Sequence, residues 1–249
     1  MISAKKNIHR NFEDLMLFEI GPIFKGSKPG EQSTVIGAIK TGKYSRKNWI
    51  EKERNFDVFD IKNDALRILN EIGIDSSKMV VSNKTKKWYH PGRSGLLSLG
   101  SSNGPELAYF GEIHPSIIKK LDLRIDNVLG FEIFLDNIPQ SKKKIRETKP
   151  QFLISDYQKV VRDFAFVVDD KYSSGEIISL VKKIDKSLVR EVKIFDVYQG
   201  DNIEVGKKSI AFNVTIEPKD KTLSDKDIEQ ISKKIILAVQ EATGATLRS

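Results

Sequence analysis

The order of secondary-structure elements after Val160 constrains the fold more than any other feature of this sequence. Apolar alternation and helix-start signals predict strand, helix, strand, strand, helix, strand between Val160 and Ser249. The expected strands are Val161–Asp169, Val189–Gln199, Lys208–Glu217 and Ala245–Ser249, and the expected helices begin at Ser173 or Ser174 and at Ser224. This order predicts a single sheet with both helices on one face.

The third of these strands shows which of its sides the helices should cover. Its apolar side carries Ile210, Phe212, Val214 and Ile216, and its other side carries Ser209, Ala211, Asn213 and Thr215. We therefore expect a ferredoxin-like βαββαβ fold whose polar sheet face remains open. From the pattern alone, that face is either an ordinary solvated surface or a surface for flat polar groups such as single-stranded RNA bases.

The first half of the chain differs, because short strands outnumber helices between residues 1 and 140. Strands are predicted at Leu15–Ile20, Thr34–Lys40, Met79–Ser82, Gly95–Leu99, Leu107–Ile113 and Val128–Leu135, the first of them stopping at Gly21-Pro22. A helical period from Val58 to Ile72 places Phe59, Ala65, Leu66, Ile68, Leu69 and Ile72 on one side. Gly73 should end that helix, and a short helix should follow Pro115. The pattern predicts a mostly antiparallel sheet.

Composition narrows the class of protein. A chain of 249 residues is long enough for two domains, and 39% hydrophobic with 31% charged residues is typical of soluble globular proteins. No apolar run approaches the roughly 18 residues that span a membrane. The N-terminus does not resemble a secretory signal, and the absence of cysteine excludes disulfides and thiolate metal sites. We therefore expect a cytoplasmic protein with no membrane contact.

The net charge of +8 would suit a polyanionic partner. The distribution of this charge along the chain is more informative. Residues 1–150 carry the whole excess, whereas residues 151–249 hold 16 basic and 16 acidic residues. Half of the excess lies in Lys142–Lys149. We interpret residues 141–150 as a basic linker between domains 1–140 and 151–249, either solvated or in contact with phosphates. Net charge therefore gives no argument for RNA binding by the second domain.

Two features of the sequence could suggest a zinc site and a phosphate-binding loop, but neither has the residues that such a site requires. His9, His90 and His114 are far apart and lack neighbouring ligands at the spacing of a zinc site. Lys40-Thr41-Gly42-Lys43 lacks the glycine spacing and the serine or threonine of a phosphate-binding loop. We expect neither a catalytic residue nor a metal ligand in this chain.

Five blocks of the second half form a distinctive set: Val161–Val168, Lys193–Gly200, Gly206–Phe212, Lys221–Asp225 and Gly244–Arg248. In this order and spacing they resemble the C-terminal anticodon-binding domain of bacterial phenylalanyl-tRNA synthetase beta subunits. Three segments of the first half, Phe18–Phe24, His90–Ser94 and Tyr109–Pro115, are similar to another module of that subunit. This module has the shape of a class II synthetase catalytic core without its catalytic residues. Because full beta subunits are several times longer, the resemblance implies a C-terminal fragment with an incomplete first module.

The resemblance also implies a function. The whole enzyme, with two alpha and two beta subunits, joins phenylalanine to its tRNA using ATP and magnesium, and the alpha subunit performs the chemistry. The present chain would be non-catalytic, would need no cofactor of its own, and would pack against the alpha subunit. By the same resemblance, Asp196, Tyr198, Ser209 and Arg248 would lie around the anticodon of phenylalanine tRNA. These side chains can stack on bases, accept base hydrogens or pair with phosphate.

Two alternatives remain open at this stage. One is a free-standing ferredoxin-like RNA-binding module, which would bind any RNA equally. The other is a ferredoxin-like regulatory domain that binds a small metabolite between its helices or at a dimer edge, and is stabilised by that metabolite without binding RNA. Only the function implied by the resemblance requires binding that depends on anticodon bases.

Overall fold

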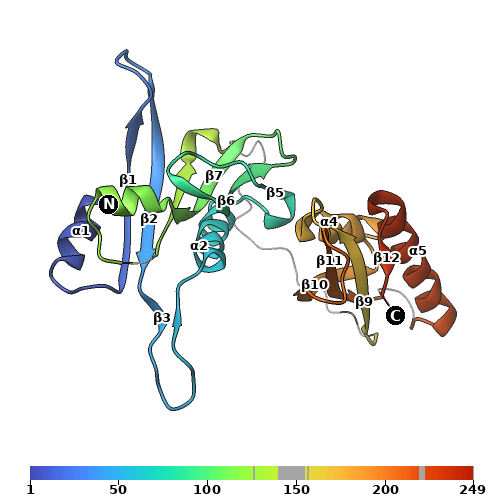
Figure 1. Cartoon of the computed structure of the whole chain (residues 1–249). Helices are drawn as coiled ribbons and strands as arrows, with labels where there is room; N and C mark the ends of the chain where they lie inside the picture. The colour runs from blue at the N-terminus through green and yellow to red at the C-terminus, as the bar shows by residue number, and fades with distance from the viewer. Residues whose placement is uncertain (126, 140–154, 156, 219–221, 249) are drawn as a thin grey trace. The chain divides into compact units, whose positions relative to one another are not determined.

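The structure is a computed structural model that describes residues 1–125, 127–139, 155, 157–218 and 222–248 (Figure 1). It divides into two compact units, Met1–Ile145 and Arg146–Ser249, each with a core of its own. The predicted linker, residues 141–150, lies outside the described residues, so the domain bounds of 1–140 and 151–249 stay a prediction. No helix within the described ranges is long and apolar enough to cross a membrane.

The first unit is built on a six-stranded antiparallel sheet with the order β1-β2-β8-β7-β6-β5. Its strands are β1 (Leu15–Phe24), β2 (Gln32–Thr41), β5 (Met79–Ser82), β6 (Tyr89–Leu99), β7 (Glu106–Ile113) and β8 (Val128–Phe134). A separate small sheet pairs β3 (Lys43–Ser45) with β4 (Arg54–Asn55). Two 3-10 turns, η1 (Ser76–Lys78) and η2 (Leu135–Asn137), complete the unit with three helices. The predicted antiparallel sheet is confirmed.

Helix α2 (Val58–Glu71) covers one face of this sheet. Asp57 begins the helix by forming a capping box with Asp60, which satisfies backbone amides that have no partner inside the helix. The buried residues of the helix are Ile61, Ala65 and Leu69, four positions apart. They pack against β7 and β8, and Gly73, with a φ of +99°, ends the helix without the strain that a Cβ would cause.

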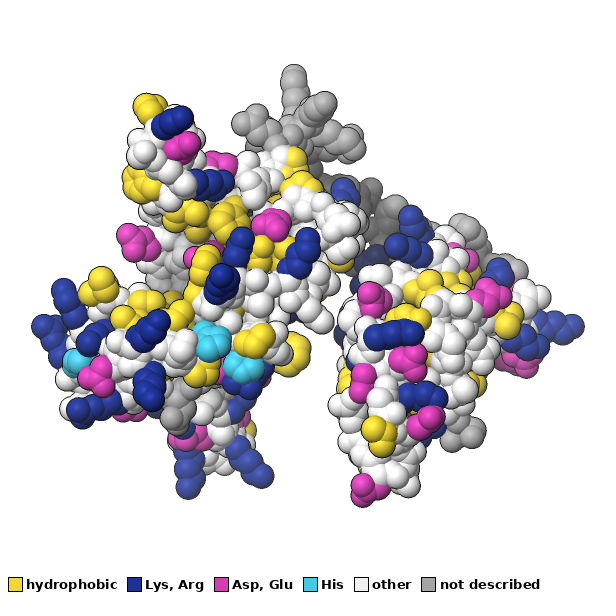
Figure 2. Space-filling model, turned by 45° about the horizontal axis from the view of Figure 1, so that its top comes forward, with side chains coloured by type: hydrophobic (Ala, Val, Ile, Leu, Met, Phe, Trp, Pro, Cys, Tyr) yellow, Lys and Arg dark blue, Asp and Glu magenta, His cyan; other side chains and the backbone are white. Residues whose placement is uncertain are grey.

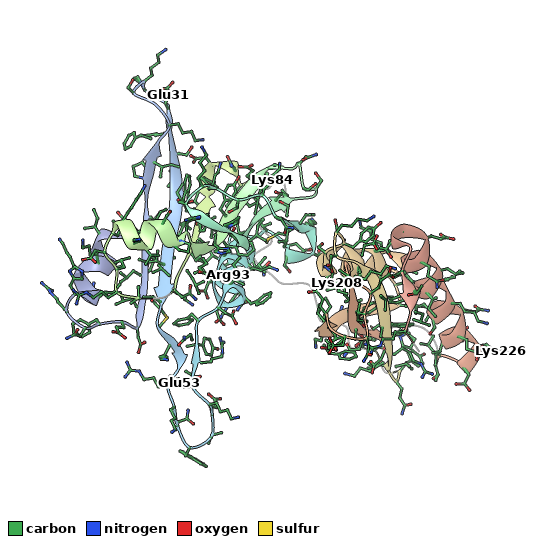
Figure 3. All side chains as sticks on the ribbon, viewed as in Figure 1. Glu31, Glu53, Lys84, Arg93, Lys208 and Lys226 are labelled. Atoms are coloured by element: carbon green, nitrogen blue, oxygen red, sulfur yellow. The ribbon has the colours of Figure 1, made fainter. Side chains whose placement is uncertain are left out.

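The opposite face of the sheet carries α1 (Ile2–Ile8) and α3 (Pro115–Lys120). Buried residues of this second core include Ala4, Tyr89, Leu96, Tyr109, Ile118 and Val128. The hairpin formed by β1 and β2 extends beyond the helices, with Glu31 near its tip (Figure 3). Both faces of the sheet are therefore covered near its centre, whereas the edge strand β1 is left partly bare.

Three details of the first unit differ from the sequence-based expectation. Strand β1 continues through Gly21-Pro22, because it is an edge strand in which proline can occupy a position without an inter-strand bond. Phe59, predicted on the apolar side of α2, is 71% exposed, and Ile61 is buried instead. Helix α1 has no predicted counterpart, since its seven residues are too few for a clear period.

The second unit is a four-stranded antiparallel sheet with the order β10-β11-β9-β12. Its elements are β9 (Val160–Asp169), α4 (Ser174–Ile184), β10 (Val189–Tyr198), β11 (Lys207–Ile216), α5 (Asp225–Thr243) and β12 (Thr246–Leu247). The predicted ferredoxin-like order is confirmed, and each predicted element is present within a few residues of its expected bounds. Strands β9 and β11 form the centre of the sheet.

Both helices of the second unit pack on the same face of its sheet. Ser173 begins α4 and Ser224 begins α5, each through a capping box. The core between helices and sheet contains Phe164, Phe166, Ile177, Val181, Ile210, Phe212, Val214, Ile231, Ile235 and Val239. Gly244 ends α5 in the left-handed conformation, with a φ of +67°. The other face of the sheet is left without a helix in the part of the unit that the structure describes.

Phe212, fully buried in the central strand β11, offers a test of this core. Its ring centroid lies 5.8 Å from those of Phe164 and Phe166. Phe212→Ala should lower the free energy of unfolding of the second unit by about 3–5 kcal/mol, because it removes these contacts and leaves a cavity. Amide hydrogen exchange of β11 under increasing urea measures the loss. Thr215→Ala, on the uncovered side of the same strand, should cost less than about 1 kcal/mol, and equal losses would contradict the assignment of faces.

Candidate functional site

The uncovered face of the second unit brings together the four predicted site residues. Cross-strand pairing forms one row across β10, β11, β9 and β12, consisting of Tyr198, Ser209, Val167 and Thr246. The next row consists of Asp196, Ala211 and Ala165, and the Arg248 amide continues it by donating to the Ala165 carbonyl at 2.8 Å. Directly paired residues share a face of the sheet, so all four predicted residues belong to the uncovered one.

A β-bulge in β10 gives Asp196 and Tyr198 this orientation. Ile194 pairs with Phe212 of the core and Asp196 pairs with Ala211, which leaves Phe195 as an extra residue without a pairing partner. Strict alternation from Ile194 would place Asp196 on the helix-covered face. The bulge reverses the alternation, and both site residues of β10 therefore lie on the uncovered face.

Ser209 lies beneath Arg248. The Arg248 Nη1 atom donates a hydrogen bond of 3.4 Å to Ser209 Oγ, and Ser209 is only 3% exposed although Arg248 is an exposed residue. The arginine side chain must cross β9 to reach β11, and the small Ala165 in its row leaves room for this path. Ala211 is also buried, at 8% exposure. Alternation along β11 alone predicts that Ser209 and Ala211 are exposed to solvent. Both residues are buried instead.

Tyr198 is held at the edge of the sheet by the loop that follows it. The ring is 38% exposed, and a Cβ on Gly200 would collide with the Tyr198 hydroxyl, so glycine leaves space for the ring. Gln199 Nε2 donates to Asp170 Oδ1 at 2.6 Å, and Lys208 Nζ donates to the Asp170 carbonyl at 3.0 Å. These bonds tie the loop to the end of β9, which gives the aromatic ring a defined position.

Phe195 is an exposed residue beside this site that the sequence pattern does not identify. It is 57% exposed next to Asp196. Its apolar character in the middle of a strand predicts a core position. Only the cross-strand register shows that it is the unpaired residue of a bulge, and a single sequence does not contain that register.

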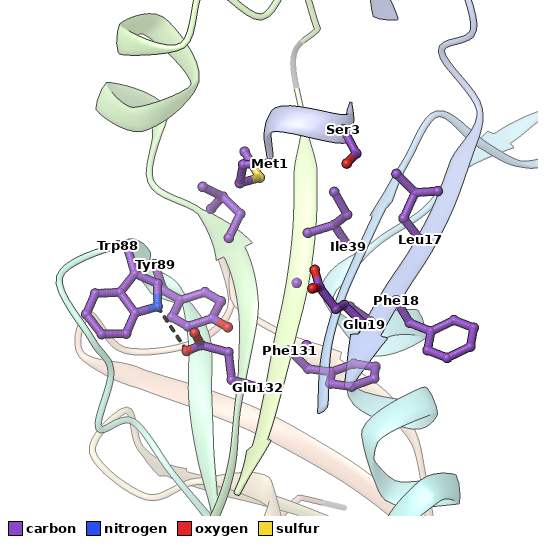
Figure 4. A pocket seen from close by; sticks show the side chains of 14 residues that line it. Met1, Ser3, Leu17, Phe18, Glu19, Ile39, Trp88, Tyr89, Phe131 and Glu132 are labelled. Carbon is purple, nitrogen blue, oxygen red and sulfur yellow. Dashed lines mark hydrogen bonds between the residues drawn. The ribbon is translucent and has the colours of Figure 1, made fainter. Parts of the chain in front are cut away.

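The first unit contains a cavity of about 380 Å³ on the sheet face that carries α1 (Figure 4). Glu19 and Glu132 pair with Gly37 from its two sides, so the glycine leaves open space between two carboxylates. Trp88 Nε1 donates to Glu132 Oε2 at 3.0 Å. Burial raises the pKa of Glu132, while the Trp88 hydrogen bond and the nearby Lys86 charge oppose this shift.

The histidines and acidic residues of the first unit do not gather into a metal-binding cluster in the described residues. No three His, Cys, Asp or Glu side chains in the described part of the chain could hold a metal ion together. His90 and His114 stabilise the turns in which they lie. Their Nδ1 atoms accept hydrogen bonds from the backbone amides of Gly92 and Ser116, at 3.1 and 3.2 Å. The uncovered face of the second unit is the candidate site, because it brings the four predicted residues together.

Two known domain families match the chain. Residues 1–135 match the phenylalanyl tRNA synthetase beta chain CLM domain. Residues 155–248 match the ferredoxin-fold anticodon binding domain. The two matches cover the two structural units in turn.

Curated relatives match almost the whole chain. The phenylalanine–tRNA ligase beta subunit of Rhodospirillum rubrum is 42% identical over 247 residues, which are 99% of this chain and 30% of the relative. That of Bartonella quintana is 40% identical over 252 residues, covering 100% of this chain and 31% of the relative. The chain thus spans about 30% of the length of these relatives. A solved pyrrolysyl-tRNA synthetase from Desulfitobacterium hafniense matches 53% of this chain and 43% of the length of that synthetase chain. Its TM-score of 0.37 and its sequence identity of 17% are too low to support a structural inference.

Glu132 should make the stability of the first unit depend on pH. Its folded-state pKa is raised from the ordinary 4.5, so folding favours the protonated carboxyl. This contribution is complete below the unfolded-state pKa and is lost as the pH rises through the raised folded-state pKa. Glu132→Gln should therefore be more stable than the unchanged chain near neutral pH.

Thermal unfolding at several pH values from about 4 to 8, followed by tryptophan fluorescence, measures this difference. Glu19→Gln is the matched control, because Glu19 lies across Gly37 but is exposed. The gain in stability near neutral pH should be specific to Glu132→Gln. A Glu132→Gln chain that is less stable near neutral pH would show that the Trp88 hydrogen bond to an ionised carboxylate outweighs the cost of burial.

Proposed function

The chain belongs to the family of phenylalanyl-tRNA synthetase beta chains, and on this basis we propose that its second unit binds the anticodon region of phenylalanine tRNA. The first unit packs against a catalytic alpha subunit, which joins phenylalanine to the tRNA with ATP and magnesium. Two alpha and two beta subunits form the whole enzyme in this proposal. The present chain contributes recognition and positioning, holds no cofactor, and acts in the cytoplasm, where tRNAs are charged.

One observation carries the proposal for the second unit: Asp196, Tyr198, Ser209 and Arg248 gather in two adjacent rows of the uncovered face. The exposed ring of Tyr198 can stack on an unpaired base, and Asp196 can accept hydrogens from a base edge. Arg248 can stack on a base or pair with phosphate. Ser209 is buried beneath Arg248, so its role is to position the guanidinium group.

The charge balance of the second unit supports selective recognition. Residues 151–249 carry as many acidic as basic side chains. General attraction to phosphates, which supplies most non-specific affinity for nucleic acid, is therefore weak in this unit. Affinity must come from a few directed contacts with bases. Binding of the anticodon at this face would hold the distant acceptor end of the tRNA in register with the alpha subunit, so that binding contributes to orientation as well as capture.

The apolar surface of β1 supports a protein partner for the first unit. Met16, Phe18 and Ile20 alternate along this edge strand and are 66%, 76% and 58% exposed. They share one face of the hairpin, and Phe24, near its tip, is 74% exposed. Figure 2 shows hydrophobic side chains along the projecting hairpin. A contiguous row of large apolar side chains on an uncovered edge strand is rare in a soluble monomer, and it suits the interface of a protein complex.

Tyr198→Ala should weaken the binding of phenylalanine tRNA to the full chain about tenfold or more, since stacking contributes roughly 1–3 kcal/mol per base. Tyr198→Phe should retain most of the affinity, because the ring remains. Fluorescence anisotropy with a labelled tRNA transcript gives the dissociation constants. Thr215→Ala, on the same face but several rows away, is the matched control and should have no effect.

The same titrations distinguish the proposed function from its alternatives. Tighter binding of the transcript with its own anticodon than of transcripts with altered anticodons supports the proposal. Equal binding of every RNA would indicate a general RNA-binding module instead. Stabilisation by a small metabolite without any RNA binding would indicate a regulatory domain.

Replacing Phe18 and Ile20 by serine should weaken the association of the chain with the catalytic alpha subunit by tenfold or more. Two large apolar side chains at the centre of an interface commonly contribute more than about 1 kcal/mol each. Size-exclusion chromatography and calorimetric titration of the two purified subunits measure the change. Phe59→Ser, which alters an equally exposed aromatic on α2, is the control. An unchanged affinity for the alpha subunit would remove β1 from the interface.

A further inference from the structure

Phe195 is an aromatic residue of the second unit that is more than half exposed in the middle of a strand. The register of β10 passes from Ile194, paired with Phe212, directly to Asp196, paired with Ala211. Phe195 is thus the inserted residue of the bulge and has no cross-strand partner. It is 57% exposed, lies outside the hydrophobic core, and its ring packs against no other aromatic ring among the described residues.

The exposed ring of Phe195 lies next to a residue of the candidate site. In a bulge, two residues oppose one residue of the neighbouring strand, so Phe195 and Asp196 both lie opposite Ala211. Strand β10 is at the edge of the sheet, and no further strand covers it in the described unit. A large apolar ring is therefore held beside Asp196, at the border of the uncovered face.

Val197 is a second exposed apolar residue of β10, and its position differs from that of Phe195. Val197 is 49% exposed and pairs with Ile210, which belongs to the core on the helix-covered face. It therefore lies on the side of β10 away from the site. Phe195 and Val197 are close in sequence and similarly exposed, but only Phe195 lies opposite a residue of the site rows.

We propose that Phe195 is a second base-stacking residue, whose ring receives a nucleotide next to the one that stacks on Tyr198. This inference rests on the proposed RNA-binding function. Phe195 and Tyr198 are three residues apart, about 10 Å along an extended strand. Asp196 lies between them as a hydrogen-bond acceptor. Two rings with an acceptor between them match two successive unstacked bases, because any base offers a flat face for stacking and a polar edge for hydrogen bonding.

The bulge contributes more to the site than the reversal of side-chain alternation along β10. A regular strand could not place Phe195 and Asp196 opposite the same residue. The inserted residue supplies both the reversal that turns Asp196 toward the uncovered face and an additional aromatic ring at its border. The β-bulge thus becomes part of the binding surface.

The test compares Phe195→Ala with Val197→Ala in the full chain. The probe is a phenylalanine tRNA transcript, together with transcripts that carry a single abasic nucleotide at successive positions of the anticodon loop. Phe195→Ala should weaken binding of the intact transcript about tenfold. Val197→Ala should leave the affinity within about twofold. Phe195→Trp should bind at least as well as the unchanged chain, because a larger ring still stacks.

The abasic transcripts identify the contact. At one loop position, removal of the base should weaken binding to the unchanged chain but not to Phe195→Ala, since the base and the ring then belong to one interaction. Tyr198→Ala should show the same insensitivity at a neighbouring position. If Phe195→Ala weakens binding equally with every abasic transcript, the ring acts through the structure of the strand and the proposal is overturned.

A deletion variant separates the ring from the bulge. Removing Phe195 leaves Ile194 and Asp196 adjacent, as are their partners Phe212 and Ala211, so every other pair of β10 keeps its register. This variant should lose about as much affinity as Phe195→Ala while its thermal unfolding stays cooperative. Full affinity in the folded deletion variant would overturn the proposal.

The outcomes for Phe195 and Tyr198 also separate the second stacking position from the proposed RNA-binding function. If Tyr198→Ala weakens tRNA binding and Phe195→Ala does not, the second stacking position is wrong and the proposed function stands. If neither change alters binding of phenylalanine tRNA, the proposed RNA-binding face itself is wrong.

Discussion

The candidate site depends on one extra residue in strand β10. The core requires Val192 and Ile194 to face the helices, where they pair with Val214 and Phe212. In a regular strand the same requirement would place Asp196 on the apolar face, where burial of an unpaired carboxylate is costly. The bulge at Phe195 satisfies both ends of the strand. Packing of the core and presentation of the site are thus linked through a single local irregularity.

The site also depends on small residues at the centre of the sheet. Ala165 and Ala211 occupy the row that ends in Arg248, and their short side chains let the guanidinium group reach Ser209 on β11. The last strand pairs with β9, so the position of Arg248 requires the complete sheet. Four strands therefore contribute to one surface, and the outer two, β10 and β12, are joined only through the centre of the sheet.

The two units show two ways in which a sheet can leave a surface for partners. In the first unit both faces of the sheet are covered, and the uncovered surface is the apolar edge strand β1. In the second unit both helices pack on one face, and no helix covers the other face within the described residues. The unit as a whole carries as many acidic as basic side chains. An apolar edge suits association with another protein, whereas a polar face with exposed aromatic rings suits unpaired bases. The different partners proposed for the units follow from this difference.

The sequence by itself determined the order of helices and strands, because that order depends on local periodicity and capping signals. Its recognisable blocks predicted two domains and four residues of the candidate site. The helix from Val58, the capping serines Ser173 and Ser224, and the alternation around Phe212 all appear in the structure as predicted. Only the tertiary structure decided that β10 contains a bulge, that Ser209 is buried beneath Arg248, and that Phe195 is unpaired. These features depend on which residues of neighbouring strands oppose one another. The periodicity of a single strand does not record that register, because it is set by contacts between segments far apart in the chain.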